Sequence, residues 1–258
     1  MVFPLGDSHR TKILPIATYL LIVINVVMYL VQVDRGDQFT TAFAATPYEI
    51  THNEDIDAPF RMEARREANL RGGERIAADE RIVPQGPVPF PVWLTLFTSM
   101  FLHGSPLHLA GNMLYLWIFG DNCEEVLGSI RYVIVYFICG LAASAAQIAA
   151  APNSLIPTLG ASGAIAGVMG IYLIWFPYHR VRVLVFRVIL EVPAVIVIGL
   201  WIAVQIAQGA GSFGKLGVSG GVAYLAHVGG AVAGIIVGVM FRNDARALGL
   251  PTVFDRVR

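Results

Sequence analysis

The chain has 258 residues, of which 56% are hydrophobic and only 14% are charged, whereas an ordinary soluble domain has about 25% charged residues. This composition excludes a soluble enzyme and a disordered chain, and the net charge of zero gives no electrostatic reason to expect a nucleic-acid partner. Half of the charged residues lie within residues 34–81, and residues 132–179 contain none. Uncharged stretches of this length are typical of membrane proteins, because about 20 helical residues cross the hydrocarbon core of a bilayer.

Six apolar segments predict six membrane-spanning helices, because lipid cannot satisfy the backbone of an isolated strand. The first segment is too long for a signal-peptide core and has further spans behind it, so we expect it to be retained. The sequence thus predicts an all-α integral membrane protein, a six-transmembrane-helix bundle over residues 13–241 between terminal segments 1–12 and 242–258. The predicted spans are 13–33, 107–119 (with an apolar approach at 93–102), 132–150, 160–176, 192–206 and 222–241.

Arginine and lysine residues in the short connections predict the orientation, since cytoplasmic loops carry an excess of them. If the N-terminus lies in the cytoplasm, ten of these residues fall on the cytoplasmic side and only Lys215 falls on the other. We therefore expect both termini in the cytoplasm and a bacterial inner membrane as the location. The ten residues are Arg10, Lys12, Arg131, Arg180, Arg182, Arg187, Arg242, Arg246, Arg256 and Arg258.

The long first loop, residues 34–92, is the one large hydrophilic feature of the sequence. Residues 61–70 predict a short surface helix ended by Gly72 and Gly73, and residues 84–91 predict an extended proline-rich stretch. Two interpretations of the loop remain open: a solvated linker, or a lid element that contacts substrate at the bilayer surface.

The two cysteines, Cys123 and Cys139, lie inside or beside apolar segments and far from any Cys-x-x-Cys spacing. We expect buried free thiols, which imply neither a disulfide framework nor a redox compartment.

Glycines recur along the predicted fourth and sixth helices at or near a four-residue spacing, which allows two helices to approach closely. We expect these two helices to contact each other. The glycines are Gly163, Gly167 and Gly170 in one helix, and Gly230, Gly234 and Gly238 in the other.

Ser162 and His227 lie near the outer ends of these two glycine-rich helices. A serine in a membrane helix often only packs, but the neighbouring Gly160 and Gly163 leave its hydroxyl and backbone N–H accessible, as a nucleophile in acyl transfer requires. A histidine in a membrane could donate a hydrogen bond to another helix, bind a metal or act as a base. Both residues are expected about 10 Å below the outer surface, at 1.5 Å per helical residue, which favours a nucleophile and its general base.

His108 and Asn112 are four residues apart and therefore lie on one face of the predicted second helix. Two hydrogen-bond donors at the depth of Ser162 suit an oxyanion hole, together with the backbone N–H of Ser162. His103, His108 and His227 are the residues that a zinc site would use, but no carboxylate lies at that depth and no His-Glu-x-x-His motif is present. We therefore expect no metal.

In order along the chain, the segments HGSPLHLAGNM (residues 103–113), GASG (160–163) and AHVGG (226–230) resemble the rhomboid family of intramembrane serine proteases. The resemblance covers residues 13–241. It implies Ser162 as the nucleophile, His227 as the general base, and His108, Asn112 and the Ser162 N–H as the oxyanion hole, while His103 matches a histidine with a structural role.

Two positions depart from the family pattern. Ala166 stands where many members have an aromatic residue four positions after the serine, under the base. Trp93 is followed by Leu94, so the Trp-Arg pair of the first loop is missing. Neither departure removes a reacting group.

The expected function is hydrolysis of peptide bonds in or next to transmembrane segments of membrane proteins by a Ser–His dyad, without a cofactor. Transmembrane substrates and the lipid bilayer are the expected partners, and the oligomeric state is open. One alternative is a catalytically inactive rhomboid-like protein that binds membrane helices. Another is a small transporter, for which Glu191 is the candidate intramembrane carboxylate; we expect instead an interfacial pair of Glu191 with Arg187.

Overall fold

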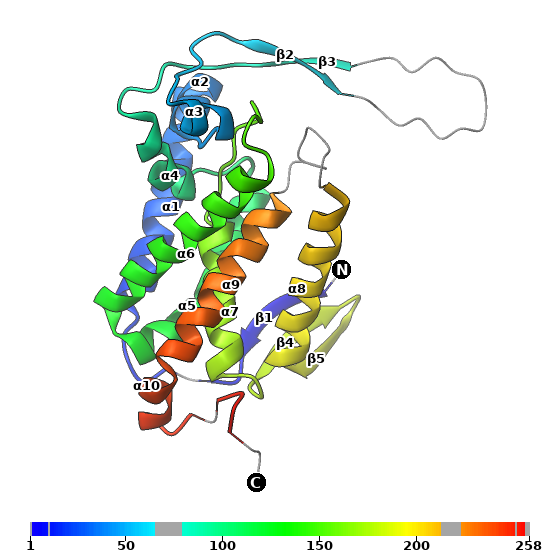
Figure 1. Ribbon diagram of the computed structural model, residues 1–258. Helices are drawn as coiled ribbons and strands as arrows, with labels where there is room; N and C mark the ends of the chain where they lie inside the picture. The colour runs from blue at the N-terminus through cyan, green and yellow to red at the C-terminus, as the bar shows by residue number, and fades with distance from the viewer. Residues whose placement is uncertain (1, 10, 65–78, 213–222, 251, 256–258) are drawn as a thin grey trace, which may run out of the picture.

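The computed structural model describes residues 2–9, 11–64, 79–212, 223–250 and 252–255. Within these residues, six long helices pack side by side in a bundle (Figure 1). They are α1 (Ile16–Arg35), α5 (Pro106–Leu127), α6 (Ser129–Ala150), α7 (Ser162–Trp175), α8 (Ala194–Ser212) and α9 (Tyr224–Met240).

Each long helix overlaps one of the predicted apolar segments. Two of them, Ile16–Arg35 and Ser129–Ala150, are long and apolar enough by length and composition to cross a membrane. The number of six spans stays a prediction, since α5 does not meet this test despite its 22 residues and the other apolar helical segments are shorter. These are Val92–Phe101, Ser162–Trp175, Ala194–Ala210 and Tyr224–Met240.

Helix α5 continues well beyond residue 119, where its apolar segment ends, and its last turns contain acidic residues. The fully buried Glu124 explains why. Its carboxylate accepts hydrogen bonds from the backbone N–H groups of Ala17 (2.9 Å) and Thr18 (2.8 Å), and from the hydroxyls of Thr18 (2.8 Å) and Ser129 (2.6 Å). A carboxylate at these unpaired N–H groups stabilises the start of α1 and locks α5 against it.

The loops contain β-strands that the sequence analysis did not predict. β1 (Val2–Asp7), β4 (Arg180–Val185) and β5 (Val188–Pro193) form an antiparallel sheet in the order β1-β4-β5, which lies beside α8 at one end of the bundle (Figure 1). β2 (Phe60–Ala64) pairs with β3 (Asp79–Val83). The other elements are α2 (Asp37–Phe43), α3 (Pro47–His52), η1 (Val92–Leu94), α4 (Thr95–Thr98), η2 (Ser99–Phe101) and α10 (Arg242–Ala247).

Two local predictions were wrong. The surface helix expected over residues 61–70 is contradicted by β2, because its first residues pair with β3; residues 65–78 and Lys215 lie outside the described residues. Glu191 is not at a helix end, since β-branched and apolar residues there favour a hairpin and α8 begins only at Ala194. Glu191 lies on β5 opposite Arg182 of β4.

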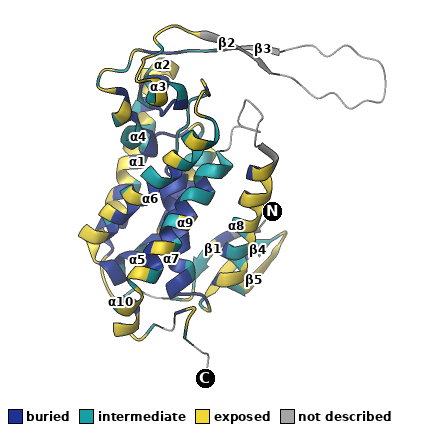
Figure 2. Cartoon of the chain, in the orientation of Figure 1, coloured by how far each residue is buried: buried dark blue, intermediate teal, exposed yellow. Residues whose placement is uncertain are grey.

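Burial separates the helices into a central one and outer ones. Helix α7 is buried along nearly its whole length, whereas α1, α6 and α8 expose their outward faces (Figure 2). Large apolar side chains on these faces are well exposed, for example Leu30 at 63% and Leu200 at 60%. An apolar exterior around a packed interior is what a bilayer requires of a helical bundle. Both cysteines are buried and free, as predicted.

The predicted contact between the two glycine-rich helices is confirmed. A methyl group at Gly230 would overlap the carbonyl oxygen of Gly163, and one at Gly234 would overlap the carbonyl oxygen of Gly167. The backbones of α7 and α9 therefore touch directly, which only glycine permits. Near the other end of the pair, the indole N–H of Trp175 donates to the carbonyl of Gly238 at 2.7 Å.

This contact makes a testable prediction about stability. Gly234→Ala forces α9 away from α7, and overpacking of this kind costs about 1–3 kcal/mol. We expect a lower Tm for the purified protein in detergent. Gly199→Ala in α8 is the matched control, because a methyl group there meets no atom within 4 Å. The control should be neutral or slightly stabilising. Equal melting temperatures for the two variants would contradict the direct backbone contact.

Candidate active site

The structure brings Ser162 and His227 together. Ser162 is the first residue of α7, and His227 lies in the first turn of α9. The Oγ atom of Ser162 lies 2.8 Å from Nε2 of His227, within hydrogen-bond distance. His227 is only 9% exposed. This short distance follows from the packing of α7 against α9. Gly163 follows Ser162 directly and Gly230 lies three residues after His227, and these two glycines hold the two backbones in contact.

The second ring nitrogen of His227 also has a partner, which the sequence analysis missed. Nδ1 lies 2.8 Å from Oε1 of Gln205 on α8, and the Gln205 side chain is buried. The ring of Trp201, one turn earlier on α8, lies against the imidazole with the centroids 5.5 Å apart. The signal was present in the sequence: Trp201 and Gln205 are four residues apart, on one face of a largely apolar helix.

An aromatic ring does lie against His227, but it comes from a different helix than the family pattern predicts. That pattern places the ring four positions after the serine, at residue 166. Ala166 is fully buried in α7 and presents only a methyl group. The ring that lies against His227 comes from Trp201 of α8 instead.

His108 lies in the first turn of α5, which has a well-formed start. Ser105 is the N-cap and its hydroxyl accepts the backbone N–H of His108 at 3.1 Å, while Pro106 occupies the first helical position. The His108 ring rests on Gly160, whose φ is +129°. A methyl group at Gly160 would lie 3.2 Å from Nε2 of His108 and 3.6 Å from Oγ of Ser162. Glycine is therefore needed where His108 approaches Ser162.

Asn112 lies one turn after His108 and is oriented by His103. Its Nδ2 atom donates to Nε2 of His103 at 2.9 Å. His103 is buried and fixed in turn by Gln32 of α1, which accepts the His103 backbone N–H at 2.9 Å and donates to its carbonyl at 3.3 Å. An amide group has two N–H donors, so Asn112 retains a second one.

The first loop holds the segment that leads into Ser162. Ala45 and Thr158 exchange backbone hydrogen bonds of 3.0 and 2.9 Å, and the backbone N–H of Tyr48 donates to the carbonyl of Ser154 at 3.1 Å. The backbone N–H of Gly160 donates to the carbonyl of Ser99 at 2.9 Å. Part of the loop therefore supports the entry to α7.

Nowhere in the part of the chain that the structure describes do three His, Cys, Asp or Glu side chains group so that they could hold a metal ion. The candidate site instead contains the hydroxyl of Ser162 and the imidazole of His227, which is hydrogen-bonded to the side-chain amide of Gln205. His108 and Asn112 are further polar donors.

Comparisons with known proteins agree with the motifs. A family model, the rhomboid domain, matches residues 91–244. Rhomboid protein 1, mitochondrial, of Saccharomyces cerevisiae is 31% identical over 149 residues, which cover 56% of this chain and 41% of that protein. Rhomboid protease GluP of Bacillus subtilis is 36% identical over 94 residues (36% and 17%), and Inactive rhomboid protein 1 of Drosophila melanogaster is 26% identical over 110 residues (40% and 8%). The chain spans less than half the length of each of these three proteins.

The geometry of Asn112 makes a prediction that separates donation from packing. If Asn112 donates to a developing oxyanion, Asn112→Ala should lower kcat with little change in KM, because that bond strengthens only as charge develops. Loss of one such donor costs about 100- to 1,000-fold, and we expect about 100-fold or less because other donors remain. Turnover and Tm of the purified variant are the measurements. A lower Tm with kcat within about threefold of wild type would assign Asn112 to packing alone.

Proposed function

The chain belongs to the rhomboid family, and we propose that it is an intramembrane serine endopeptidase in which Ser162 and His227 form the catalytic dyad. The observation that carries the proposal is the 2.8 Å contact between Ser162 Oγ and His227 Nε2. A nucleophile and a base within hydrogen-bond distance, with the base oriented by a further group, form the arrangement that activates a serine.

The reaction begins when His227 Nε2 takes the proton of Ser162 as Oγ attacks the peptide carbonyl. The protonated imidazole then gives this proton to the leaving amine, and the acyl group stays on Ser162. Water, deprotonated by the same histidine, releases the acyl group and restores the serine.

The negative charge on the carbonyl oxygen needs donors fixed before the reaction starts. We assign this role to His108, the second N–H of Asn112 and the backbone N–H of Ser162. The rigid supports of these donors favour the assignment. His108 is held by Gly160 and the Ser105 cap, and Asn112 by His103.

Transmembrane segments are the proposed substrates, since the site lies at one end of an apolar bundle. A substrate helix shields its own carbonyls and must unwind before attack. Sequences with Gly, Ala, Ser or Pro near the cleavage point are favoured because their helices open easily.

Two alternatives are less well supported. The first alternative is an inactive rhomboid-like protein, because one matching relative is named as inactive. This chain, however, retains a serine and a histidine in contact. A transporter would use an intramembrane carboxylate, whereas Glu191 lies exposed on β5.

We expect Ser162→Ala to abolish cleavage of a model transmembrane substrate, and labelling by a fluorophosphonate, while leaving Tm near that of wild type. The matched control is Ser144→Ala, which removes a half-buried hydroxyl from α6, a helix that carries neither member of the dyad, and should cleave normally. Cleavage by purified Ser162→Ala at a rate near wild type would refute the proposal.

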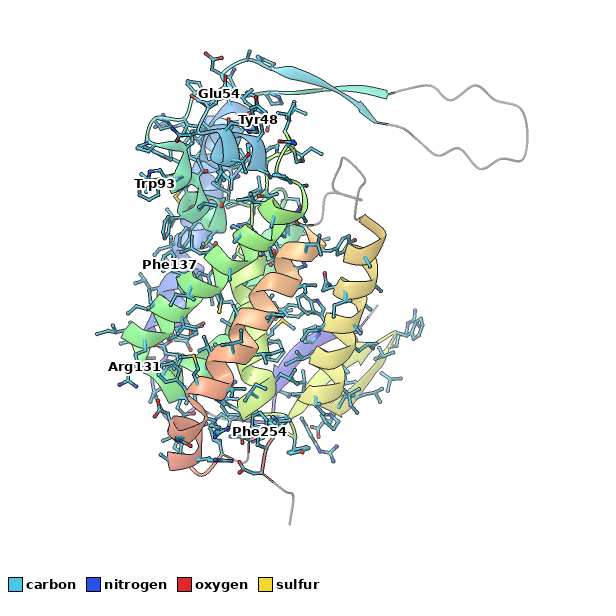
Figure 3. All side chains as sticks on the ribbon, viewed as in Figure 1. Tyr48, Glu54, Trp93, Arg131, Phe137 and Phe254 are labelled. Atoms are coloured by element: carbon cyan, nitrogen blue, oxygen red, sulfur yellow. The ribbon has the colours of Figure 1, made fainter. Side chains whose placement is uncertain are left out.

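We also propose that the end of the bundle with Ser162 faces the periplasmic or extracellular side and that both termini are cytoplasmic. Figure 3 shows Tyr48 and Glu54 at one end of the molecule and Arg131 and Phe254 at the opposite end. The end with Arg131, where the arginines of the short connections lie, is the one expected in the cytoplasm.

Cysteine labelling in intact cells tests this orientation. The native cysteines are buried, so background labelling should be low. Asn153→Cys, in the exposed connection before α7, should react with an impermeant maleimide, whereas Tyr178→Cys, after α7, should react only once the cells are opened. The reverse pattern would overturn the orientation.

A further inference from the structure

We propose that Gln205 is a positioning residue that holds His227 in the one tautomer able to activate Ser162. This inference rests on the proposed function. It assigns a role to α8, which carries neither member of the dyad, and extends the dyad to a Ser–His–Gln array with a neutral third member.

The tautomer follows from the two contacts of the ring. A neutral imidazole has one N–H donor and one acceptor nitrogen. The side-chain oxygen of Gln205 faces Nδ1 at 2.8 Å and accepts only if the proton is on Nδ1. Nε2 then has a free lone pair directed at the Ser162 hydroxyl, also at 2.8 Å. In the other tautomer Nε2 would carry the proton and could not accept that of Ser162.

Gln205 acts without changing its own protonation. When Ser162 attacks, its proton moves to Nε2, and the Nδ1–H bond to the amide oxygen becomes a bond from a cation, which is stronger. The interaction thus favours the charged state that forms during the reaction. An amide does this without the cost of a buried carboxylate, which is high inside a membrane helix.

A stripe of α8 presents Gln205 to the site. Trp201, Gln205 and Gly209 are spaced four residues apart, so they lie on one face of the helix. Gly209 packs against the first turn of α9, where an added methyl group would lie 3.1 Å from the Leu225 side chain. Trp201 packs on the imidazole ring. The close approach brings the amide within reach, and the indole limits rotation of the ring.

The contact matters more here because position 166 of α7 carries no aromatic ring. Ala166 presents only a methyl group, and the α7 side chain that contacts the His227 ring is Ser162. Among the described residues, the His227 ring is hydrogen-bonded to Ser162 and Gln205 and packs against the ring of Trp201. Without Gln205, only the hydrogen bond with the Ser162 hydroxyl, which can both donate and accept, would act on the choice of tautomer.

The experiment compares two substitutions of Gln205 in the full-length protein. Gln205→Leu removes the acceptor at similar volume and should lower both kcat and the rate of fluorophosphonate labelling of Ser162 by about 10- to 100-fold, with KM within about twofold. Gln205→Glu keeps an oxygen at Nδ1 and should stay within about fivefold of wild type. Its carboxylate also stabilises the imidazolium, so the acidic limb of the kcat–pH profile should move to higher pH.

Gln147→Leu is the matched control, because it is the same exchange near the outer end of α6. The side-chain oxygen of Gln147 is buried and has no hydrogen-bond partner in the described part of the chain. Its activity, labelling rate and pH profile should be those of wild type.

Each outcome decides between distinct hypotheses. Normal kcat and labelling in Gln205→Leu, with Ser162→Ala inactive, would overturn the positioning role and leave the proposed function intact. Equal losses in both Gln205 variants, with a lower Tm and an unmoved pH limb in Gln205→Glu, would reduce Gln205 to packing. Cleavage by Ser162→Ala would refute the proposed function itself.

Discussion

The direct backbone contact between α7 and α9 is the constraint on which the rest of the site depends. Gly230 and Gly234 lie on the carbonyl oxygens of Gly163 and Gly167, so no side chain separates the two helices. Ser162 and His227 occupy the first turns of these helices, and this contact fixes their separation at 2.8 Å. Hydrophobic burial gives little help in lipid, whose chains are as apolar as the helices, so close packing must supply the attraction.

Polar contacts position the side chains that lie outside the contact between α7 and α9. His108 is placed by the Ser105 cap and by the space above Gly160, and Asn112 by His103, which α1 holds through Gln32. Each proposed oxyanion donor thus depends on a contact with another segment. Such supports allow donors to stay aligned before charge appears, which is the condition for stabilising a transition state without reorganisation.

Hydrogen bonds between separate segments also hold the structure together away from the site. Glu124 holds the starts of α1 and α6 near the far end of α5, and the first loop is hydrogen-bonded to the segment before Ser162. Helix α8 is different: apart from its stripe facing α9, much of its surface is exposed, although it provides Trp201 and Gln205, two of the side chains that contact the His227 ring. The proposed base is therefore oriented by one of the less buried helices of the bundle.

The sequence by itself determined the apolar segments, the glycine-rich pair and the polar residues Ser162, His227, His108 and Asn112, because membrane burial makes such patterns conspicuous. It did not reveal the strands. β1 pairs with β4 far along the chain and β2 pairs with β3, so these pairings depend on the tertiary structure. The β4–β5 hairpin is local, but the sequence analysis took its residues as a connection and the start of a helix. Nor did it show that Trp201 takes the place left by Ala166, or that Gln205 reaches Nδ1. Those contacts join α8 to α9, and the crossing of two helices is decided by side-chain packing that no single helix encodes.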